Sequence, residues 1–135
     1  MLSEDQIKAA PDSDYMNEAQ LEFFKQLLLD LYDSTSARIE QAKQQMATPI
    51  DLNDENDRAS MEEQNSISLR IFEREQRLLP KIQQSLKRIR EGDYGYCLES
   101  GDPIGIPRLL LRPTAEYCAE VKAIQETKEQ LYSKL

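Results

Sequence analysis

The stretch CLESGDPIGIPRLLLRPTAEYCAEV, residues 97–121, decides how the chain is organised. Cys97 is followed three positions later by Ser100, and Cys118 is followed three positions later by Val121. Two Cys-x2-Cys pairs about 15–20 residues apart hold one zinc ion, because each pair aims two thiolates at a single tetrahedral metal. Here each pair keeps one cysteine. The stretch therefore predicts a small compact segment, called the knot below, that is built on a zinc-site frame but lacks a full ligand set.

Metal binding at this frame is not expected, because two thiolates without histidine make a poor zinc site. Oxygen ligands could come from neighbouring side chains, which are Glu99, Ser100, Asp102 and Glu120. A disulfide between the two cysteines is conceivable but is not expected in a reducing compartment. We expect apolar packing to replace the metal, with Val121 joined by Ile104, Ile106, Leu109, Leu110 and Leu111 around Tyr94, Tyr96 and Tyr117.

The composition limits what the remaining residues can do. The chain has 135 residues, which suits one domain or a small core with an extension, and a net charge of -8. Such an excess of acid argues against binding to the DNA backbone, which depends on Lys and Arg. The absence of histidine excludes catalysis by Ser-His or Cys-His pairs, so we expect no enzyme. No signal peptide or apolar span is evident, and a cytoplasmic location is expected.

Two long helices are predicted before the knot. Apolar residues recur at helical spacing after Asn17, which with Gln20 resembles a capping box, and the first helix ends before Pro49. Asp54 or Asp57 is expected to cap a second helix that ends at Gly92. Its seam consists of Phe72, Leu79, Ile82, Leu86 and Ile89, with Glu75 in one slot. Helices of similar length joined by a short loop are expected to fold back as an antiparallel coiled coil.

Two features modify this hairpin. The seam near the loop is polar, with Ser60, Asn65 and Ser68, so the outer half is expected to be less stable than the base. Pro80 lies inside the second helix and removes one backbone hydrogen bond. Because the seam continues past it, we expect a kink and not an end.

The two ends of the chain are shorter elements. Ser3 is expected to cap a short helix through Ala10, and the first 15 residues either form a linker or pack on the core. Residues 92–113 predict tight turns and short strands at most, since Gly and Pro are frequent. Thr114 is expected to cap a last helix with a stripe of Tyr117, Val121, Ile124, Lys128 and Leu131.

The predicted fold is therefore mainly α. It has an N-terminal segment over 1–15 and a long antiparallel coiled-coil hairpin over 16–91, with a tip loop near 49–57. A small zinc-ribbon-like globular domain with a C-terminal helix occupies residues 92–135.

Four pieces of this sequence together resemble the DksA/TraR family of regulators that act on bacterial RNA polymerase. They are YMNEAQL at 15–21, DENDRA at 54–59, GDYGYC at 92–97 and IGIPRLLLRPTAEYC at 104–118. The resemblance runs from about Tyr15 to the C-terminus. It implies a hairpin that enters the secondary channel of the polymerase and an effect strengthened by the alarmone ppGpp. It also implies control of promoters for ribosomal RNA and amino-acid biosynthesis. We expect a monomer with no sequence-specific DNA contact and no membrane contact.

The resemblance assigns roles to individual residues. Asp54, Asp57 and Ala59 match the functional tip, and two carboxylates three positions apart at a hairpin apex also lie close together on physical grounds. A solvated helix cap is the alternative. The positions that match the ppGpp and polymerase interface are Leu78, Lys81, Arg112 and Lys122. Lys and Arg converging from several elements suit a phosphate-rich ligand, and ordinary surface cations are the alternative.

Four-cysteine members of the family hold zinc at positions that match Cys97, Ser100, Cys118 and Val121. This chain is more similar to the cysteine-poor paralogues that replace the zinc form when zinc is scarce, so we expect zinc independence. Two other functions remain open. A transcript-cleavage factor of the Gre type would place an acidic tip in the same channel to hold a second metal ion. A structural coiled-coil adaptor would make no use of its tip charges.

Overall fold

The computed structural model describes residues 1–47 and 55–133, and this part of the chain is mainly helical, as predicted. The elements are α1 (Glu4–Ala9), a 3-10 turn η1 (Asp12–Asp14), α2 (Glu18–Ala47), α3 (Glu55–Glu91), α4 (Ile106–Leu111) and α5 (Ala119–Ser133). An isolated bridge between Tyr96 and Pro103 is the one extended pairing among these residues. No helix in the described ranges is long and apolar enough to cross a membrane.

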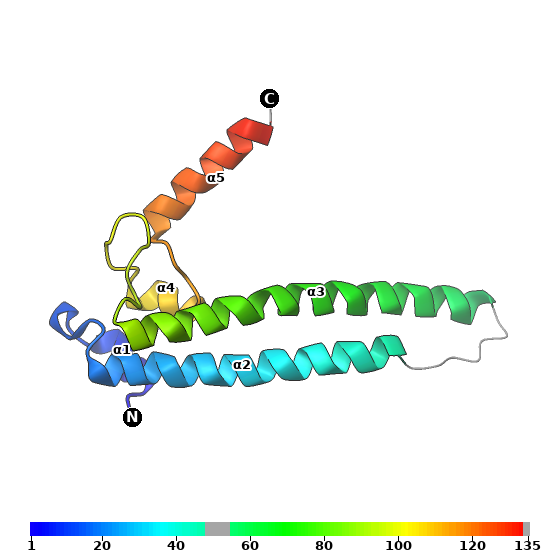
Figure 1. Ribbon diagram of the computed structural model, residues 1–135, viewed down its shortest axis with the longest axis horizontal. Coiled ribbons are helices and arrows are strands. Elements are labelled where there is room, and N and C mark those ends of the chain that lie inside the picture. Colours follow the sequence, from blue (N-terminus) through cyan, green and yellow to red (C-terminus); the bar gives the residue numbers. More distant parts are fainter. Residues whose placement is uncertain (48–54, 134–135) are drawn as a thin grey trace. The chain divides into compact units, whose positions relative to one another are not determined.

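The described residues form two compact units. The hairpin unit comprises residues 29–83, and the base unit comprises residues 1–28 together with the chain from Gln84 onward. The helices α2 and α3 contribute to both. Within the hairpin unit they run side by side in opposite directions, which confirms the predicted hairpin (Figure 1).

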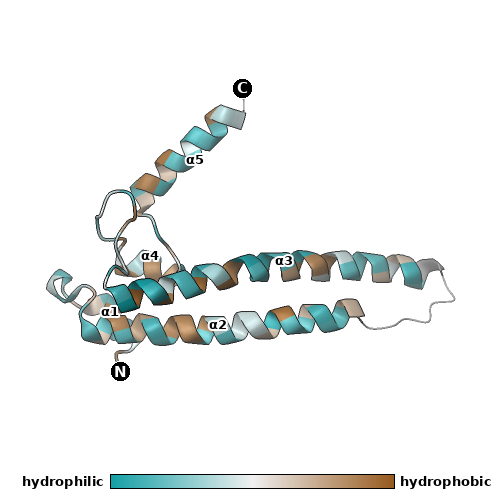
Figure 2. Ribbon diagram, viewed as in Figure 1, coloured by the Kyte–Doolittle hydropathy of each residue, from teal (hydrophilic) through white to brown (hydrophobic). Residues whose placement is uncertain are grey.

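The hairpin unit buries few large apolar side chains. Its buried residues are Thr35, Ile39, Ala42, Ser68, Glu75 and Ile82, half of them polar. Figure 2 shows hydrophilic residues over much of α2 and α3, with apolar residues interspersed. The predicted polar position at Ser68 is confirmed: this side chain is 1% exposed and its hydroxyl donates to Gln45 Oε1 at 3.0 Å. That the outer half is less stable than the base remains a prediction.

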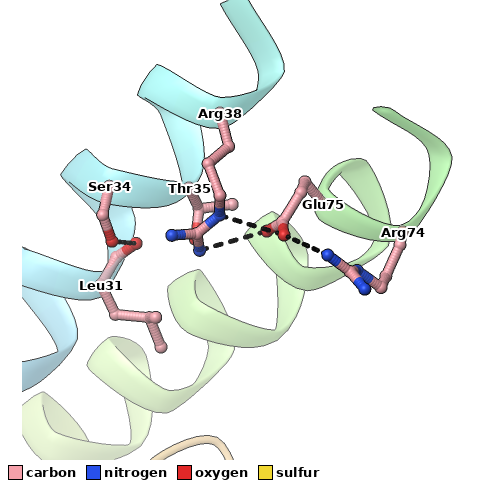
Figure 3. Close-up of polar contacts among 6 residues, drawn as sticks. All are labelled: Leu31, Ser34, Thr35, Arg38, Arg74 and Glu75. Atoms are coloured by element: carbon pink, nitrogen blue, oxygen red, sulfur yellow. Dashed lines mark hydrogen bonds and ion pairs between the residues drawn. The ribbon is translucent and has the colours of Figure 1, made fainter. Parts of the chain in front are cut away.

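Glu75 forms the main polar layer of the hairpin unit, in the seam slot where the sequence placed it. Its side chain is 5% exposed, and its carboxylate lies 3.0 Å from Arg38 Nε and 3.3 Å from Arg74 Nη2 (Figure 3). Arg38 Nη2 also donates to Glu75 Oε2 at 3.3 Å and to the hydroxyl of buried Thr35 at 3.2 Å. A carboxylate can occupy this buried slot because two guanidinium groups compensate its charge.

The starts of α1 and α2 agree with the predicted caps. Ser3 and Gln6 form a reciprocal capping box at α1. Asn17 Oδ1 accepts the backbone N–H of Gln20 at 2.9 Å, and the Gln20 side chain accepts the N–H of Met16. These contacts satisfy amides that have no partner inside the helix.

The start of the second long helix decides between the two predicted caps only in part. Because α3 begins at Glu55, Asp57 lies inside the helix and is not its cap, which leaves Asp54 as the predicted cap. Asp54 lies outside the described residues. Pro80 is confirmed as internal, since α3 continues past it to Glu91, and the kink remains a prediction.

The N-terminal segment packs within the base unit and is not a linker, which resolves the alternative left open by the sequence. Ile7 of α1 is 1% exposed, and α1 contacts α4. Tyr15 stacks edge-on against Tyr96, with ring centroids 5.6 Å apart.

Two predictions about the knot were wrong. Residues 106–111 form the helix α4 where turns or short strands were expected. Gly105 at φ 99 leads into it, and Pro107 occupies its first turn, where a missing N–H costs nothing. The last helix begins at Ala119, so Thr114 is not its cap. The backbone just before α5 bonds elsewhere: the carbonyls of Pro113, Glu116 and Tyr117 accept from Tyr94, Leu98 and Arg108.

The base core is smaller than the sequence suggested. Tyr94, Ile104 and Leu109 are buried, and the Tyr94 ring lies 5.6 Å from that of Phe24. Leu111 is 90% exposed, so its predicted place in the core was wrong. A six-residue helix buries one face, and that face holds Leu109. None of the residues of α5 is buried, and Ile124 and Leu131 of the predicted stripe are 57% and 61% exposed.

Candidate functional site

The predicted tip residues lie at the start of α3. Asp57 and Ala59 are both exposed, and Asp57 belongs to the first turn. A carboxylate in a first turn is favoured there by the positive end of the helix dipole. Asp57 therefore presents its charge to solvent without a structural duty as a cap.

The residues predicted for the ppGpp interface divide between the two units. Leu78, half-buried, and Lys81, exposed, lie on α3 in the hairpin unit. Arg112, exposed, follows α4, and Lys122, half-buried, lies in the first turn of α5, both in the base unit. Each is on a regular element or at its end, which fixes the backbone that carries it. Their convergence on one ligand remains a prediction.

Sequence reasoning missed a row of cations on α3. Arg70, Arg74, Arg77 and Lys81 are all exposed, and their spacing of four, three and four places them on one face of the helix. The periodicity was visible in the sequence. Exposed cations at this spacing are also common on helices that bind nothing, so the spacing alone does not indicate a site. On a chain of net charge -8, this row is a local cationic surface.

The remnant metal frame keeps its two turns. Cys97 and Cys118 are buried free thiols, and the Ser100 hydroxyl lies 3.8 Å from Cys118 Sγ. The first turn is closed by two backbone bonds: Cys97 donates to Asp102 at 2.8 Å, and Gly101 donates to Cys97 at 2.9 Å. The turns are joined directly where Leu98 N–H donates to Glu116 O at 2.8 Å.

The donor set of this frame does not fit a zinc ion. Val121 offers no ligand atom, and the described residues contain no group of three or more His, Cys, Asp or Glu that could hold a metal. The pKa of the Cys97 thiol is lowered to about 6. Burial on its own would raise this pKa, but hydrogen bonds from the Ser100 side chain and from the backbones of Ser100, Cys118 and Glu99 together outweigh burial.

Comparisons with known proteins agree with the fold and with this frame. Residues 20–89 match the family model of the DnaK suppressor protein DksA, N-terminal domain, and residues 92–126 match that of the prokaryotic dksA/traR C4-type zinc finger.

Curated relatives cover nearly the whole chain. The RNA polymerase-binding transcription factor DksA of Caulobacter vibrioides is 34% identical over 98% of this chain and 94% of its own length. The Escherichia coli K12 protein of the same name is 38% identical over 89% of this chain and 80% of its own. The solved structure of transcription factor DksA2 from Pseudomonas aeruginosa is 48% identical, with a TM-score of 0.82, and covers 95% of this chain and 99% of that one. With both halves matched in order and the hairpin present, the chain belongs to the DksA/TraR family.

Proposed function

We propose that this protein is a transcription regulator that binds bacterial RNA polymerase through the secondary channel. The hairpin enters the channel, and its tip approaches the active site. Acting with ppGpp, it modulates initiation at promoters for ribosomal RNA and amino-acid biosynthesis. The observation that carries the proposal is the α2–α3 hairpin in a chain whose full-length relatives are named RNA polymerase-binding transcription factors. Those names also support a cytoplasmic protein that is not an enzyme, and we propose that it acts as a monomer.

The tip supports this function through its charge. Asp57 and Ala59 are exposed on α3, and Asp54 completes the tip motif in the sequence. An exposed carboxylate can act at a distance on metal ions and mobile elements of a catalytic centre without making a covalent contact. The role proposed for Asp57 is electrostatic.

The effector site is proposed to comprise Leu78, Lys81, Arg112 and Lys122 at the polymerase interface. Three cations suit the phosphates of ppGpp, since charge-assisted hydrogen bonds are roughly twice as strong as neutral ones. The exposed row on α3 adds positive charge beside Lys81 and supports the same assignment.

Zinc independence is part of the proposal. It is supported by the donor set, which offers two thiolates, one hydroxyl and one valine at the four ligand positions. Metal analysis of protein purified without chelator tests it. We expect well under one zinc per chain, and one zinc per chain would refute it.

The central experiment is transcription in vitro from a ribosomal RNA promoter in zinc-free buffer, with and without ppGpp. The parent protein is expected to inhibit, more strongly with ppGpp. Asp57→Asn removes the tip charge and is expected to lose most of the inhibition while keeping polymerase binding. Asp33→Asn, which makes the same chemical change at an exposed site on α2, is the control and should act like the parent. If Asp57→Asn inhibits as well as the parent, the proposed tip mechanism fails.

The Gre-type alternative is tested on backtracked complexes. We expect no stimulation of transcript cleavage by the parent protein at any magnesium concentration. Cleavage that depends on Asp57 would favour the alternative.

A further inference from the structure

Each remnant turn of the metal frame has an arginine at its entrance. Arg88, a residue only 5% exposed at the end of α3, donates from Nη2 to the carbonyls of Asp93 at 2.9 Å and Tyr96 at 2.7 Å. Tyr96 directly precedes Cys97. Arg108 on α4 donates from Nε at 3.0 Å to the carbonyl of Tyr117, which directly precedes Cys118. The same interaction therefore occurs at the two places where a pair of metal ligands would begin.

Two tyrosine hydroxyls extend this arrangement. The Tyr94 hydroxyl donates to Pro113 O at 2.7 Å, and the Tyr94 residue is 1% exposed. This bond connects the backbone before the first turn to the backbone before the second turn. The Tyr15 hydroxyl donates to Gly95 O at 2.5 Å and accepts the N–H of Gly105 at 2.9 Å. Burial raises the pKa of both phenols, so both keep the proton that these bonds require.

These bonds supply what irregular backbone needs when it is buried. Carbonyl and N–H groups outside helices must find partners, and a buried group without one costs a large fraction of the stability of a small domain. In a zinc knot the metal fixes the turns, and the surrounding backbone bonds can then form. Here side chains bond the backbone directly, and the guanidinium bonds are the stronger kind. Arg88 of α3, Arg108 of α4, Tyr15 of the N-terminal segment and Tyr94 thus bond the irregular backbone that lies on either side of α4.

We propose that Arg88, Arg108, Tyr15 and Tyr94 form a polar frame that holds the two turns in place, as a zinc ion does in four-cysteine members of the family. The frame positions α4 and the start of α5, and with them Arg112 and Lys122. This inference rests on the zinc independence proposed above, but its test does not require polymerase, ppGpp or a promoter. It extends that proposal, because loss of metal ligands is explained by named replacement bonds and not by apolar packing alone.

The test is amide hydrogen exchange in the full-length protein. Lysine at position 88 keeps the charge but presents a single point donor in place of a planar fork, so Arg88→Lys cannot restore both bonds. Arg108 makes a single bond, from Nε to Tyr117 O, so Arg108→Met is used to remove it at the second turn. Arg90→Lys and Arg90→Met, at an exposed site of α3, are the matched controls. The amides to follow are those of Cys97, Leu98 and Ile104, which bond the knot backbone. Arg88→Lys and Arg108→Met are each expected to speed their exchange by about tenfold, the loss of one charge-assisted bond. Exchange in the hairpin unit should not change.

A milder variant keeps the proposal open to refutation if a variant at Arg88 or Arg108 does not fold. Tyr94→Phe deletes one oxygen and preserves the ring packed on Phe24. It is expected to speed exchange in both turns by a smaller factor of about three to ten. Unchanged exchange at the knot amides in Tyr94→Phe, or an equal effect from Arg90→Lys, would overturn the assignment.

Restoring the metal ligands provides the decisive comparison. In the double variant Ser100→Cys with Val121→Cys, loaded with zinc, the metal should hold the turns again. Arg88→Lys in that zinc-loaded background is expected to speed knot exchange by less than about twofold, against about tenfold in the parent. An effect of equal size in the zinc-loaded protein would show that Arg88 does not replace the metal. Zinc content of the parent chain, measured separately, distinguishes failure of this inference from failure of the zinc independence proposed above.

Discussion

Removing Arg38 from the hairpin unit is expected to destabilise the protein through the charge it leaves behind. Glu75 has a side chain 5% exposed and takes two contacts from Arg38, at 3.0 and 3.3 Å (Figure 3). In Arg38→Met the carboxylate keeps only Arg74, whose own side chain is 74% exposed and 3.3 Å away. The perturbation therefore exchanges a compensated buried charge for a poorly compensated one.

The magnitude follows from burial. Breaking a fully buried ion pair costs about 3–5 kcal/mol. Arg38 is 42% exposed, so water already screens part of this pair, and Arg74 remains. We expect Arg38→Met to lower the free energy of unfolding by about 2 kcal/mol. Adding Glu75→Leu removes the orphaned charge and fills the seam with an apolar group, so the double variant should return to within about 1 kcal/mol of the parent.

Urea unfolding followed by helical circular dichroism measures these values, and the cycle is completed by Glu75→Leu alone. Arg77→Met is the control. It removes an arginine from an exposed site on α3 and should change the free energy of unfolding by about 0.5 kcal/mol or less. The reasoning is refuted if Arg38→Met matches Arg77→Met, or if the double variant is as unstable as Arg38→Met.

Three further predictions concern the base unit. Gly95→Ala should cost at least about 1 kcal/mol more than Gly101→Ala in urea unfolding. Both glycines have positive φ, but a Cβ at Gly95 would lie 2.7 Å from Met16 Cγ and Sδ, whereas Gly101 has open space. Burial raises the pKa of Tyr94. The protonated Tyr94 side chain therefore contributes its full stability below about pH 10, its ordinary pKa, and this contribution falls as the pH rises above 10. Tyr94→Phe should therefore lose less stability than the parent between about pH 9 and 11. EDTA should shift the thermal midpoint of the parent by less than about 2 °C, since chelators unfold proteins whose folding depends on zinc; a larger loss would contradict zinc independence.

The hairpin could be predicted from sequence because its signals are local and repeated. Caps such as Asn17 with Gln20 and the seam of α3 depend on spacing of three and four, and that spacing is the same wherever the helix lies. The knot could not be predicted in detail, because its backbone partners are distant in sequence. Thr114 looked like a helix cap, yet the carbonyls that follow it bond Leu98 and Arg108. Leu111 looked like core, but a six-residue helix exposes one face.

The candidate site could be predicted only where the claim concerns a single residue and does not depend on how several elements come together. Exposure of Asp57 and Ala59 follows from their place near the apex, and the structure agrees. The proposed effector site needs four residues from several elements, and spacing along the chain says nothing about such distances. The bonds of Arg88 and Arg108 could not be predicted for the same reason, because the path of the irregular backbone decides which carbonyls these side chains reach.

The polar layer at Glu75 connects stability to the proposed function. A one-turn slip of α3 along α2 would move Asp57 by about 5.4 Å, enough to misplace the tip in its proposed role near the polymerase active site. Apolar seams tolerate such slips, because Leu and Ile can exchange places at similar energy, whereas Glu75 finds its guanidinium partner in one register. We expect this layer to contribute little net stability and to fix the register of the two helices. The double variant Arg38→Met with Glu75→Leu separates the effect on stability from the effect on register. We expect a near-parental free energy of unfolding with weaker inhibition of transcription. Parental inhibition by that variant would show that apolar packing alone sets the register.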